Sequence, residues 1–254
     1  MKIRIISPFI VLICLVLFVG MACGTYSTVP PTNPVEMPTH KINPTLTQLP
    51  PNELPTQFLP TETQYPDFFT ETFRGDLSLW PYDVTNGDES KFSESQTENG
   101  LQVQLDDPDL YVYYYYAPVT YRDVRLDLAN TNLGHNSNNI NLVCRNSSKG
   151  RYEFTVQNDG LYQIWAYDGT SGNFDMLADG GSTAIRIGAQ KNEITVFCIG
   201  NTLTLFINGS QVRQITDDHY FFTEGQVGFG VNISPSNPVT PVIVEFESLT
   251  ISQP

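Results

Sequence analysis

Leu203-Thr-Leu-Phe-Ile-Asn-Gly-Ser-Gln-Val-Arg-Gln-Ile215 predicts a β-hairpin. Its two arms flank Asn208-Gly209-Ser210, and Asn-Gly is the strongest short signal for a two-residue hairpin turn. The same preference for apolar residues at every second position recurs in four other segments, a pattern typical of antiparallel strands. These segments are Leu101–Leu105, Val124–Leu128, Tyr152–Val156 and Val244–Leu249.

Turn signals separate these segments along the whole of residues 67–254. They are Asn99-Gly100, Asn158-Asp-Gly160, Asp168-Gly169, Gly200-Asn201 and Asn208-Gly209. We count about a dozen strands at the spacing of a sandwich, and no helix of ordinary length. Residues 67–254 are therefore predicted to form one all-β domain, a two-sheet antiparallel jelly-roll β-sandwich.

The first 22 residues have the character of an export signal. Lys2 and Arg4 precede an apolar run, Ile5 to Val19, which is too short for a comfortable membrane span. The run ends in Gly20-Met-Ala-Cys-Gly24, which resembles a bacterial lipoprotein signal that is cleaved before a lipidated Cys23. Gly20 departs from that pattern, so an uncleaved N-terminal anchor is the alternative. Either form places the chain on the outer face of the bacterial cell membrane or in the cell envelope.

Residues 23–66 are predicted to be a lipid-anchored Pro/Thr-rich linker. Thr25 to Pro66 contains 10 of the 18 prolines and almost no charge. Such a segment cannot bury a core and prefers extended polyproline-like conformations. We expect it to hold the β-sandwich clear of the membrane surface.

The charge of the domain excludes nucleic acid as a partner. From Asp67 onward there are 10 basic and 24 acidic residues, so this part alone carries the net charge of −14. Phosphate binding needs clustered Lys and Arg, which are absent from the sequence. Nucleotide binding has no support either, because no Gly-rich loop precedes a predicted helix.

Two cysteines remain in the exported domain. If Cys14 leaves with the signal and Cys23 carries lipid, Cys144 and Cys198 are left as an even pair in an oxidising compartment. Both are predicted to face the core from neighbouring strands. We expect a Cys144–Cys198 disulfide, with two buried free thiols as the alternative.

An ordered series of phrases from Phe69 to Ser252 resembles the concanavalin A-like jelly roll, in the branch of laminin G-like and 3-keto-disaccharide hydrolase-type domains of bacterial lipoproteins. The phrases are Phe73, Trp80, Gly100-Leu-Gln-Val, Arg122-Asp-Val-Arg-Leu-Asp, Asn141-Leu-Val-Cys-Arg145, Tyr152-Glu-Phe-Thr-Val-Gln157, Asp159-Gly-Leu-Tyr162, Asn201 to Gly209, Gly225-Gln-Val-Gly-Phe and Val244-Glu-Phe-Glu-Ser-Leu. The resemblance implies one convex and one concave sheet. It also implies carbohydrate binding, and in some members hydrolysis, on the concave face or at its rim. A fold does not by itself establish function.

Motifs for catalysis and for metals are weak. Glu245 and Glu247 lack the intervening Asp of the laminarinase relatives, so a solvated strand face explains them better than catalysis. Asp106, Asp107 and Asp109 form either a candidate calcium site at a rim or an ordinary acidic turn. The three histidines lie far apart with no ligand pattern around them, so no zinc site is predicted.

Alternation predicts one polar and aromatic sheet face that suits a sugar, with amides and charges for hydroxyls and aromatic planes for stacking. Its members are Asn141, Arg145, Glu153, Gln157, Gln163, Trp165 and Tyr167. In the run Tyr111-Val-Tyr-Tyr-Tyr-Tyr116, the odd-numbered tyrosines are predicted to face one side and the even-numbered ones the other. Cross-strand pairing explains this run, and a stacking platform is the alternative.

These observations favour a membrane-anchored, non-catalytic binding module for carbohydrate or for a cell-envelope partner. One alternative is a glycoside hydrolase or lyase that uses Glu153 with Arg145 or Tyr152. The other is a structural protein-interaction domain without sugar affinity. No cofactor is expected apart from the candidate calcium.

Overall fold

The structure is a computed structural model and describes residues 65–254. The predicted signal peptide (1–22), Cys23 and residues 24–64 of the predicted linker lie outside the described residues. Within the described part, the single helix is a 3₁₀ turn, η1 (Glu89–Lys91), and no helix is long and apolar enough to cross a membrane.

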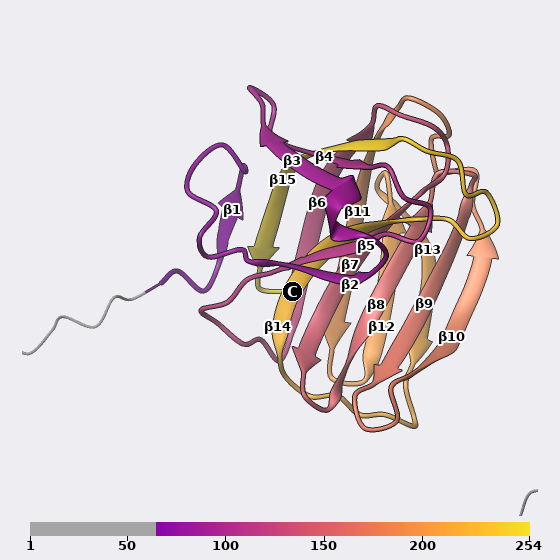
Figure 1. The fold of residues 1–254 in the computed structure, drawn as a ribbon. Coiled ribbons are helices and arrows are strands. Elements are labelled where there is room, and N and C mark those ends of the chain that lie inside the picture. The colour runs from indigo at the N-terminus through magenta and orange to yellow at the C-terminus, as the bar shows by residue number, and fades with distance from the viewer. Residues whose placement is uncertain (1–64) are drawn as a thin grey trace, which may run out of the picture. The chain divides into compact units, whose positions relative to one another are not determined.

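Fifteen strands form two antiparallel sheets that pack as a sandwich (Figure 1). The eight-stranded sheet has the order β13 (Ser210–Thr216), β12 (Thr202–Ile207), β11 (Lys191–Ile199), β6 (Val124–Asn132), β15 (Val242–Ser252), β4 (Leu101–Leu105) and β3 (Phe92–Gln96), with β1 (Phe69–Glu71) also paired to β15. The seven-stranded sheet has the order β10 (Asn173–Gly181), β9 (Leu161–Asp168), β8 (Gly150–Gln157), β7 (Asn138–Ser147), β14 (Gln226–Ile233), β5 (Tyr111–Tyr115) and β2 (Tyr82–Asn86). The predicted fold class is confirmed.

The predicted hairpin is β12 and β13, joined by Asn208-Gly209. Both turn residues have positive φ, 50° and 79°, which a two-residue type I′ turn requires. The Asn208 side chain stabilises the turn, because its Oδ1 accepts the Glu193 amide at 2.9 Å. The Asn-Gly pair therefore sets the register next to the turn, and a register shift between Leu205 and Phe206 changes it farther along the arms.

The hydrophobic core lies between the two sheets. Strands β4 and β6 alternate buried and half-buried residues, as the period-two pattern predicts. The tyrosine run also alternates as predicted: Tyr114 stacks on Phe229 in the core, with ring centroids 4.9 Å apart, whereas Tyr113 stacks on Tyr115 outside it. Cross-strand aromatic packing thus explains the core half of the run.

Strands β7 and β8 differ from the expected half-buried pattern. Every residue of β8 is buried, and so are the first eight residues of β7. One face of each strand packs in the core. The other face is polar and is partly covered by side chains of its own sheet: Tyr113 of β5 reaches Glu153, and Tyr167 of β9 and Phe174 of β10 pack against Arg151. This outer face is therefore a lined hollow rather than a flat solvated surface.

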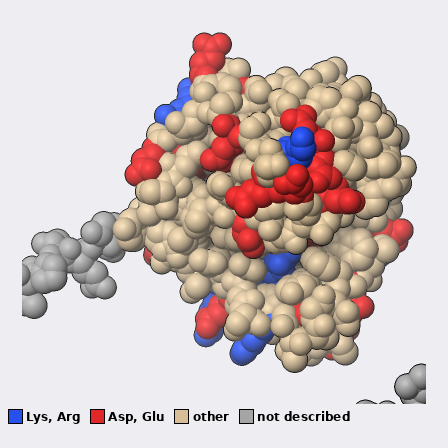
Figure 2. Space-filling model, viewed as in Figure 1, with Lys and Arg blue, Asp and Glu red and all other residues tan. Residues whose placement is uncertain are grey.

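Acidic side chains gather over η1 and β2, beside the hollow (Figure 2). Asp107 belongs to this group, and its carboxylate accepts the backbone amides of Asp88 and Asp109, each at 3.0 Å. These amides lower the pKa of Asp107. The Asp106 carboxylate accepts Gln104 Nε2. In residues 65–254, no three His, Cys, Asp or Glu side chains are placed to hold a metal ion.

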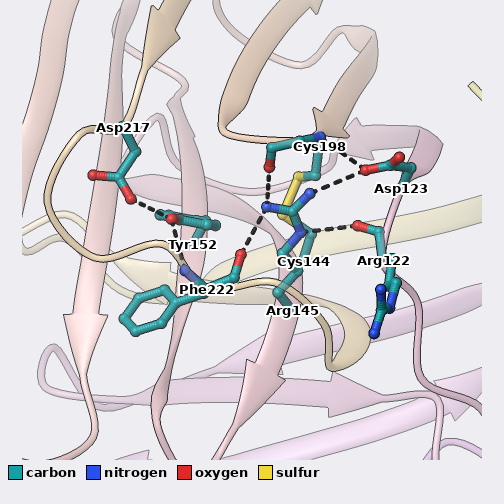
Figure 3. The surroundings of a disulfide bond; sticks show 9 residues. Arg122, Asp123, Cys144, Arg145, Tyr152, Cys198, Asp217 and Phe222 are labelled. Atoms are coloured by element: carbon teal, nitrogen blue, oxygen red, sulfur yellow. Dashed lines mark hydrogen bonds and ion pairs between the residues drawn. A yellow bond between two sulfur atoms is a disulfide. The ribbon is translucent and has the colours of Figure 1, made fainter.

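A disulfide joins the two sheets, as predicted for Cys144 and Cys198 (Figure 3). Cys144 lies on β7 and Cys198 on β11, so the two residues face one another across the core instead of lying on neighbouring strands of one sheet. Both are fully buried. The bond closes a loop of the chain with a sequence separation of 54 residues.

Candidate functional site

The outer face of the seven-stranded sheet carries a groove with a volume of 810 Å³. The groove lies across the strands, because its lining comes from β2, β5, β14, β7, β8, β9 and β10 and from the chain that follows β14. Figure 2 views the molecule from this side. The lining residues are Thr85, Asn86, Tyr111, Tyr113, Asn139, Arg151, Glu153, Thr155, Gln157, Leu161, Gln163, Trp165, Tyr167, Phe174, Asn232, Ser234, Pro235 and Ser236.

Strand register arranges the floor of the groove in rows. One row runs across four strands through Tyr111, Asn232, Asn139 and Gln157, each opposite the next. Residues directly opposite one another on paired strands project to the same face, so these four side chains all point to the outer side of the sheet. The row presents three amides next to one another.

Two glycines of β14 make room for tyrosines on this floor. A Cβ at Gly230 would lie 2.7 Å from Cδ1 of Tyr113, and one at Gly228 would lie 2.6 Å from Cδ1 of Tyr115. The two rings therefore occupy the space where side chains of β14 would stand. Lying over β14, Tyr113 extends far enough to donate its hydroxyl to Oε1 of Glu153 on β8, at 2.9 Å.

An ion pair lies at one end of the floor. Arg151 Nε and Glu153 Oε2 are 3.2 Å apart, and both side chains are almost fully buried. Burial raises the pKa of Glu153, and Arg151 and the Tyr113 hydroxyl oppose this rise. Burial alone would lower the pKa of Arg151, but the Glu153 carboxylate together with Tyr115 and Tyr113 outweighs burial, and the net shift is upward. Each group therefore stabilises the charged form of the other.

Aromatic rings surround the Arg151 guanidinium. Its carbon Cζ lies 5.0 Å from the ring centroid of Tyr113, 4.8 Å from that of Tyr167 and 5.3 Å from that of Phe174. Trp165 meets Phe174 edge to face, with centroids 6.4 Å apart. Cation–π contacts of this kind fix the guanidinium and keep the rings apart, so one wall of the groove is a set of ordered aromatic planes.

Solved structures share this architecture. A carbohydrate-binding module, CBM66 from Bacillus subtilis, is 16% identical over 69% of this chain and 98% of its own, with a TM-score of 0.51. A β-glucanase of Bacillus licheniformis is 12% identical over 75% of this chain and 100% of its own, with a TM-score of 0.55. A Bacillus subtilis protein of unknown function with a galectin-like fold is 10% identical over 73% of this chain and 94% of its own, with a TM-score of 0.56.

The fold is a concanavalin A-like jelly roll. The sequence resemblance to that fold is therefore confirmed at the level of architecture. No protein-family model and no curated protein matches the chain. At these sequence identities the shared jelly roll establishes the fold alone. The function of the groove has to be inferred from its own residues.

The jelly roll brings together five of the seven predicted site residues: Glu153, Gln157, Gln163, Trp165 and Tyr167 line the groove. Asn141 is fully buried beneath it, where its Nδ2 donates to Asn232 Oδ1 at 2.8 Å and its Oδ1 accepts Thr155 Oγ1 at 2.9 Å. Asn141 therefore supports two lining residues without lining the groove itself.

Arg145, the seventh predicted residue, does not lie in the groove. A β-bulge follows Cys144, and Arg145 has a positive φ of 59°, so strict alternation ends there. The side chain is buried beside the disulfide and donates to the carbonyls of Arg122, Gly200 and Phe222 at 2.9, 2.6 and 2.7 Å (Figure 3). It ties three connecting segments of the jelly roll together.

The catalytic partners considered for Glu153 are not beside it. Tyr152 points to the opposite face, where its hydroxyl donates to Asp217, and Arg145 lies in the disulfide region. Glu245 and Glu247 lie on β15 of the other sheet, held by Thr97 and Thr131. Among the described residues, Glu153 is the one carboxylate that lines the groove.

Several residues that line the groove are not among the predicted site residues. Arg151 and Asn139 each lie two positions before a predicted member, Glu153 and Asn141, so extending the same alternation would have identified both. Phe174 lies in an exposed strand whose pattern is not periodic. No signal in the sequence identifies it.

Proposed function

We propose that this domain is a carbohydrate-binding module that holds its ligand in the groove. The observation that carries the proposal is the composition of the lining: ordered aromatic planes on one wall and a row of amides on the floor. Aromatic rings stack on the apolar faces of sugars, and amides exchange hydrogen bonds with hydroxyl groups. The presence of a carbohydrate-binding module and a β-glucanase among the proteins that share the fold supports the proposal.

The charges of the groove support binding without hydrolysis. Glycoside hydrolysis requires a pair of carboxylates, one to protonate the leaving oxygen and one to act as nucleophile or base. Glu153 lines the groove without a second Asp or Glu from the described residues, and both of its oxygens already accept hydrogen bonds. A protein of the cell envelope is the competing ligand, and it would be expected to use the exposed rim more than the buried floor.

Replacing Trp165 by alanine should weaken polysaccharide binding by roughly thirtyfold, because a buried aromatic anchor at the centre of an interface contributes about 2 kcal/mol or more. A glycan array followed by titration of the strongest ligand measures the change. The matched control is Phe197→Ala, which removes a half-buried ring from β11 in the other sheet. Absence of any glycan binding, or equal binding by Trp165→Ala and wild type, would contradict a sugar site in this groove.

We also propose that Cys23 carries the lipid that anchors the chain, with residues 23–66 as the linker between membrane and domain. The support is the order of Lys2, Arg4, the apolar run and Ala22-Cys23-Gly24. Cys23→Ala should abolish incorporation of labelled palmitate and leave the chain with an uncleaved signal. Labelling that persists in Cys23→Ala would contradict lipidation at this residue. Cys14→Ala, within the signal, is the matched control and should be labelled like the wild type.

A further inference from the structure

The Arg151 guanidinium presents two donor atoms to the groove that the protein leaves free. Its Nε pairs with Glu153, whereas no hydrogen bond or ion pair from residues 65–254 reaches Nη1 or Nη2. Neither atom is among the buried polar atoms without a partner, so a molecule in the groove can reach both. The side chain as a whole is only 10% exposed. Arg151 is therefore a largely buried cation whose outer edge is open to a ligand.

The charge that the groove offers to a ligand is positive. Both oxygens of Glu153 already accept hydrogen bonds from the protein, Oε1 from the Tyr113 hydroxyl and Oε2 from Arg151. Arg151 is the one Lys or Arg among the described lining residues, and Figure 2 shows a basic patch within the hollow. An anionic group on a ligand thus has a cationic partner at this place.

The shape of this edge suits a carboxylate. Tyr167 and Phe174 pack against the guanidinium, with ring centroids 4.8 and 5.3 Å from Cζ, so its orientation is held before a ligand arrives. Nη1 and Nη2 form a planar fork, which matches the two oxygens of a carboxylate. A sugar hydroxyl can also accept from this fork, but a charge-assisted bidentate pair is stronger.

The opposite end of the groove is acidic. There the lining includes Thr85 and Asn86 of β2, and the exposed carboxylates of Asp83 and Asp88 lie on either side of them in the chain. Between this end and Arg151, the described floor residues of β5, β14 and β7 are uncharged. A second carboxylate on a ligand would meet like charge at the β2 end, which costs free energy. The groove therefore favours a ligand that is anionic at one end and neutral along the rest.

We propose that the groove binds a glycan with a single carboxylate, on a hexuronic or sialic acid residue, and that Nη1 and Nη2 of Arg151 donate to its two oxygens. The neutral sugars of this glycan extend over the floor toward β2. This inference rests on the proposed carbohydrate binding and adds the class of sugar and the residue that selects it. Polyuronates, which carry a carboxylate on every ring, are poor ligands because of the acidic end.

The test uses pairs of ligands that differ in one carboxylate. The acidic probes are cellobiouronic acid, aldotetraouronic acid and sialyllactose, and each is compared with a counterpart whose carboxyl group is reduced to a primary alcohol. Oligomers of polygalacturonate are the polyanionic probes. Titration calorimetry with the full-length chain in detergent gives each dissociation constant. This comparison needs only the wild type, so it decides the proposal even if a variant is unstable.

Two variants assign the effect to Arg151. Arg151→Lys keeps a cation beside Glu153 but lacks the planar fork, whereas Arg213→Lys makes the same exchange at an exposed residue of β13 in the other sheet and is the matched control. Thermal unfolding verifies that each variant is folded. A purely structural role of Arg151 would weaken the acidic probe and its reduced counterpart equally and leave their ratio unchanged.

Wild type and Arg213→Lys should bind at least one acidic probe about tenfold or more tightly than its reduced counterpart, because hydrogen bonds to charged groups are the stronger ones. In Arg151→Lys this ratio should fall to about threefold or less. Equal binding of both members of every pair by the wild type, an unchanged ratio in Arg151→Lys, or tighter binding of polygalacturonate oligomers than of the single-acid probes would each overturn this inference while leaving sugar binding intact. Absence of binding to every probe, acidic or reduced, would instead contradict the proposed function itself.

Discussion

Replacing Arg151 by methionine should lower the free energy of unfolding by about 3–5 kcal/mol at pH 7, because it leaves the buried Glu153 carboxylate without its cation. It should also remove most of the affinity for glycan, since Tyr113, Tyr167 and Phe174 lose the guanidinium that separates them. Urea denaturation and titration with the bound polysaccharide measure the two effects. Arg213→Met, at an exposed residue of β13, is the matched control.

The loss of stability in Arg151→Met should depend on pH in a defined direction. Burial raises the pKa of Glu153 in the folded protein, so folding favours the protonated carboxyl. Stability linked to such a group is present below its unfolded pKa of about 4.3 and is lost as the pH rises through the folded value. The deficit of Arg151→Met should therefore be smaller at pH 4 than at pH 8. Adding Glu153→Gln should recover stability at pH 8, and a double variant as unstable as the single one would contradict an uncompensated charge as the cause.

Removing the disulfide with Cys144→Ala and Cys198→Ala should lower the free energy of unfolding by about 4 kcal/mol, through the greater entropy of the unfolded chain. This magnitude follows from closing a loop with a sequence separation of 54 residues. Urea denaturation of the double variant and of the wild type gives the difference.

Dithiothreitol provides an internal control for this effect. It should lower the stability of the wild type toward that of the double variant and leave the double variant unchanged. Sugar binding at temperatures where both proteins are folded should be nearly equal, because the bond lies in the core and away from the groove. Equal stability of the oxidised wild type and the double variant would show that the bond does not constrain the unfolded chain.

Most of the architecture could be predicted because each strand carries its own pattern. Val124–Leu128 and Tyr152–Val156 show their inward faces by alternation, and Asn208-Gly209 fixes a turn by its own conformational preference. The even number of cysteines in the domain and the oxidising compartment expected for an exported chain predict the disulfide. The sequence could not place Cys144 and Cys198 on opposite sheets, because alternation along a strand does not say which strands are neighbours.

The candidate site could be predicted only where the strands are regular. Arg145 was assigned to the wrong surface because a bulge with a left-handed residue interrupts β7, and a side-chain period of two does not reveal a bulge. Alternation predicts the correct face of β7 for Asn141. It does not show that Asn141 lies beneath the groove, because the depth of this side chain depends on the Asn232 and Thr155 side chains above it. The contact of Tyr113 with Glu153 depends on Gly230 in a strand far away in sequence.

Residues of the polar floor are less free to be substituted than residues of the chain that follows β14. Amides and charges of the floor belong to paired strands whose opposite faces pack in the core, so exchanging them disturbs folding as well as recognition. Ser234, Pro235 and Ser236 line the groove from the connection between β14 and β15, where the chain is free of sheet pairing. New ligand preferences would therefore be engineered, or would diverge among relatives, more readily through insertions and exchanges in this connection than through the floor.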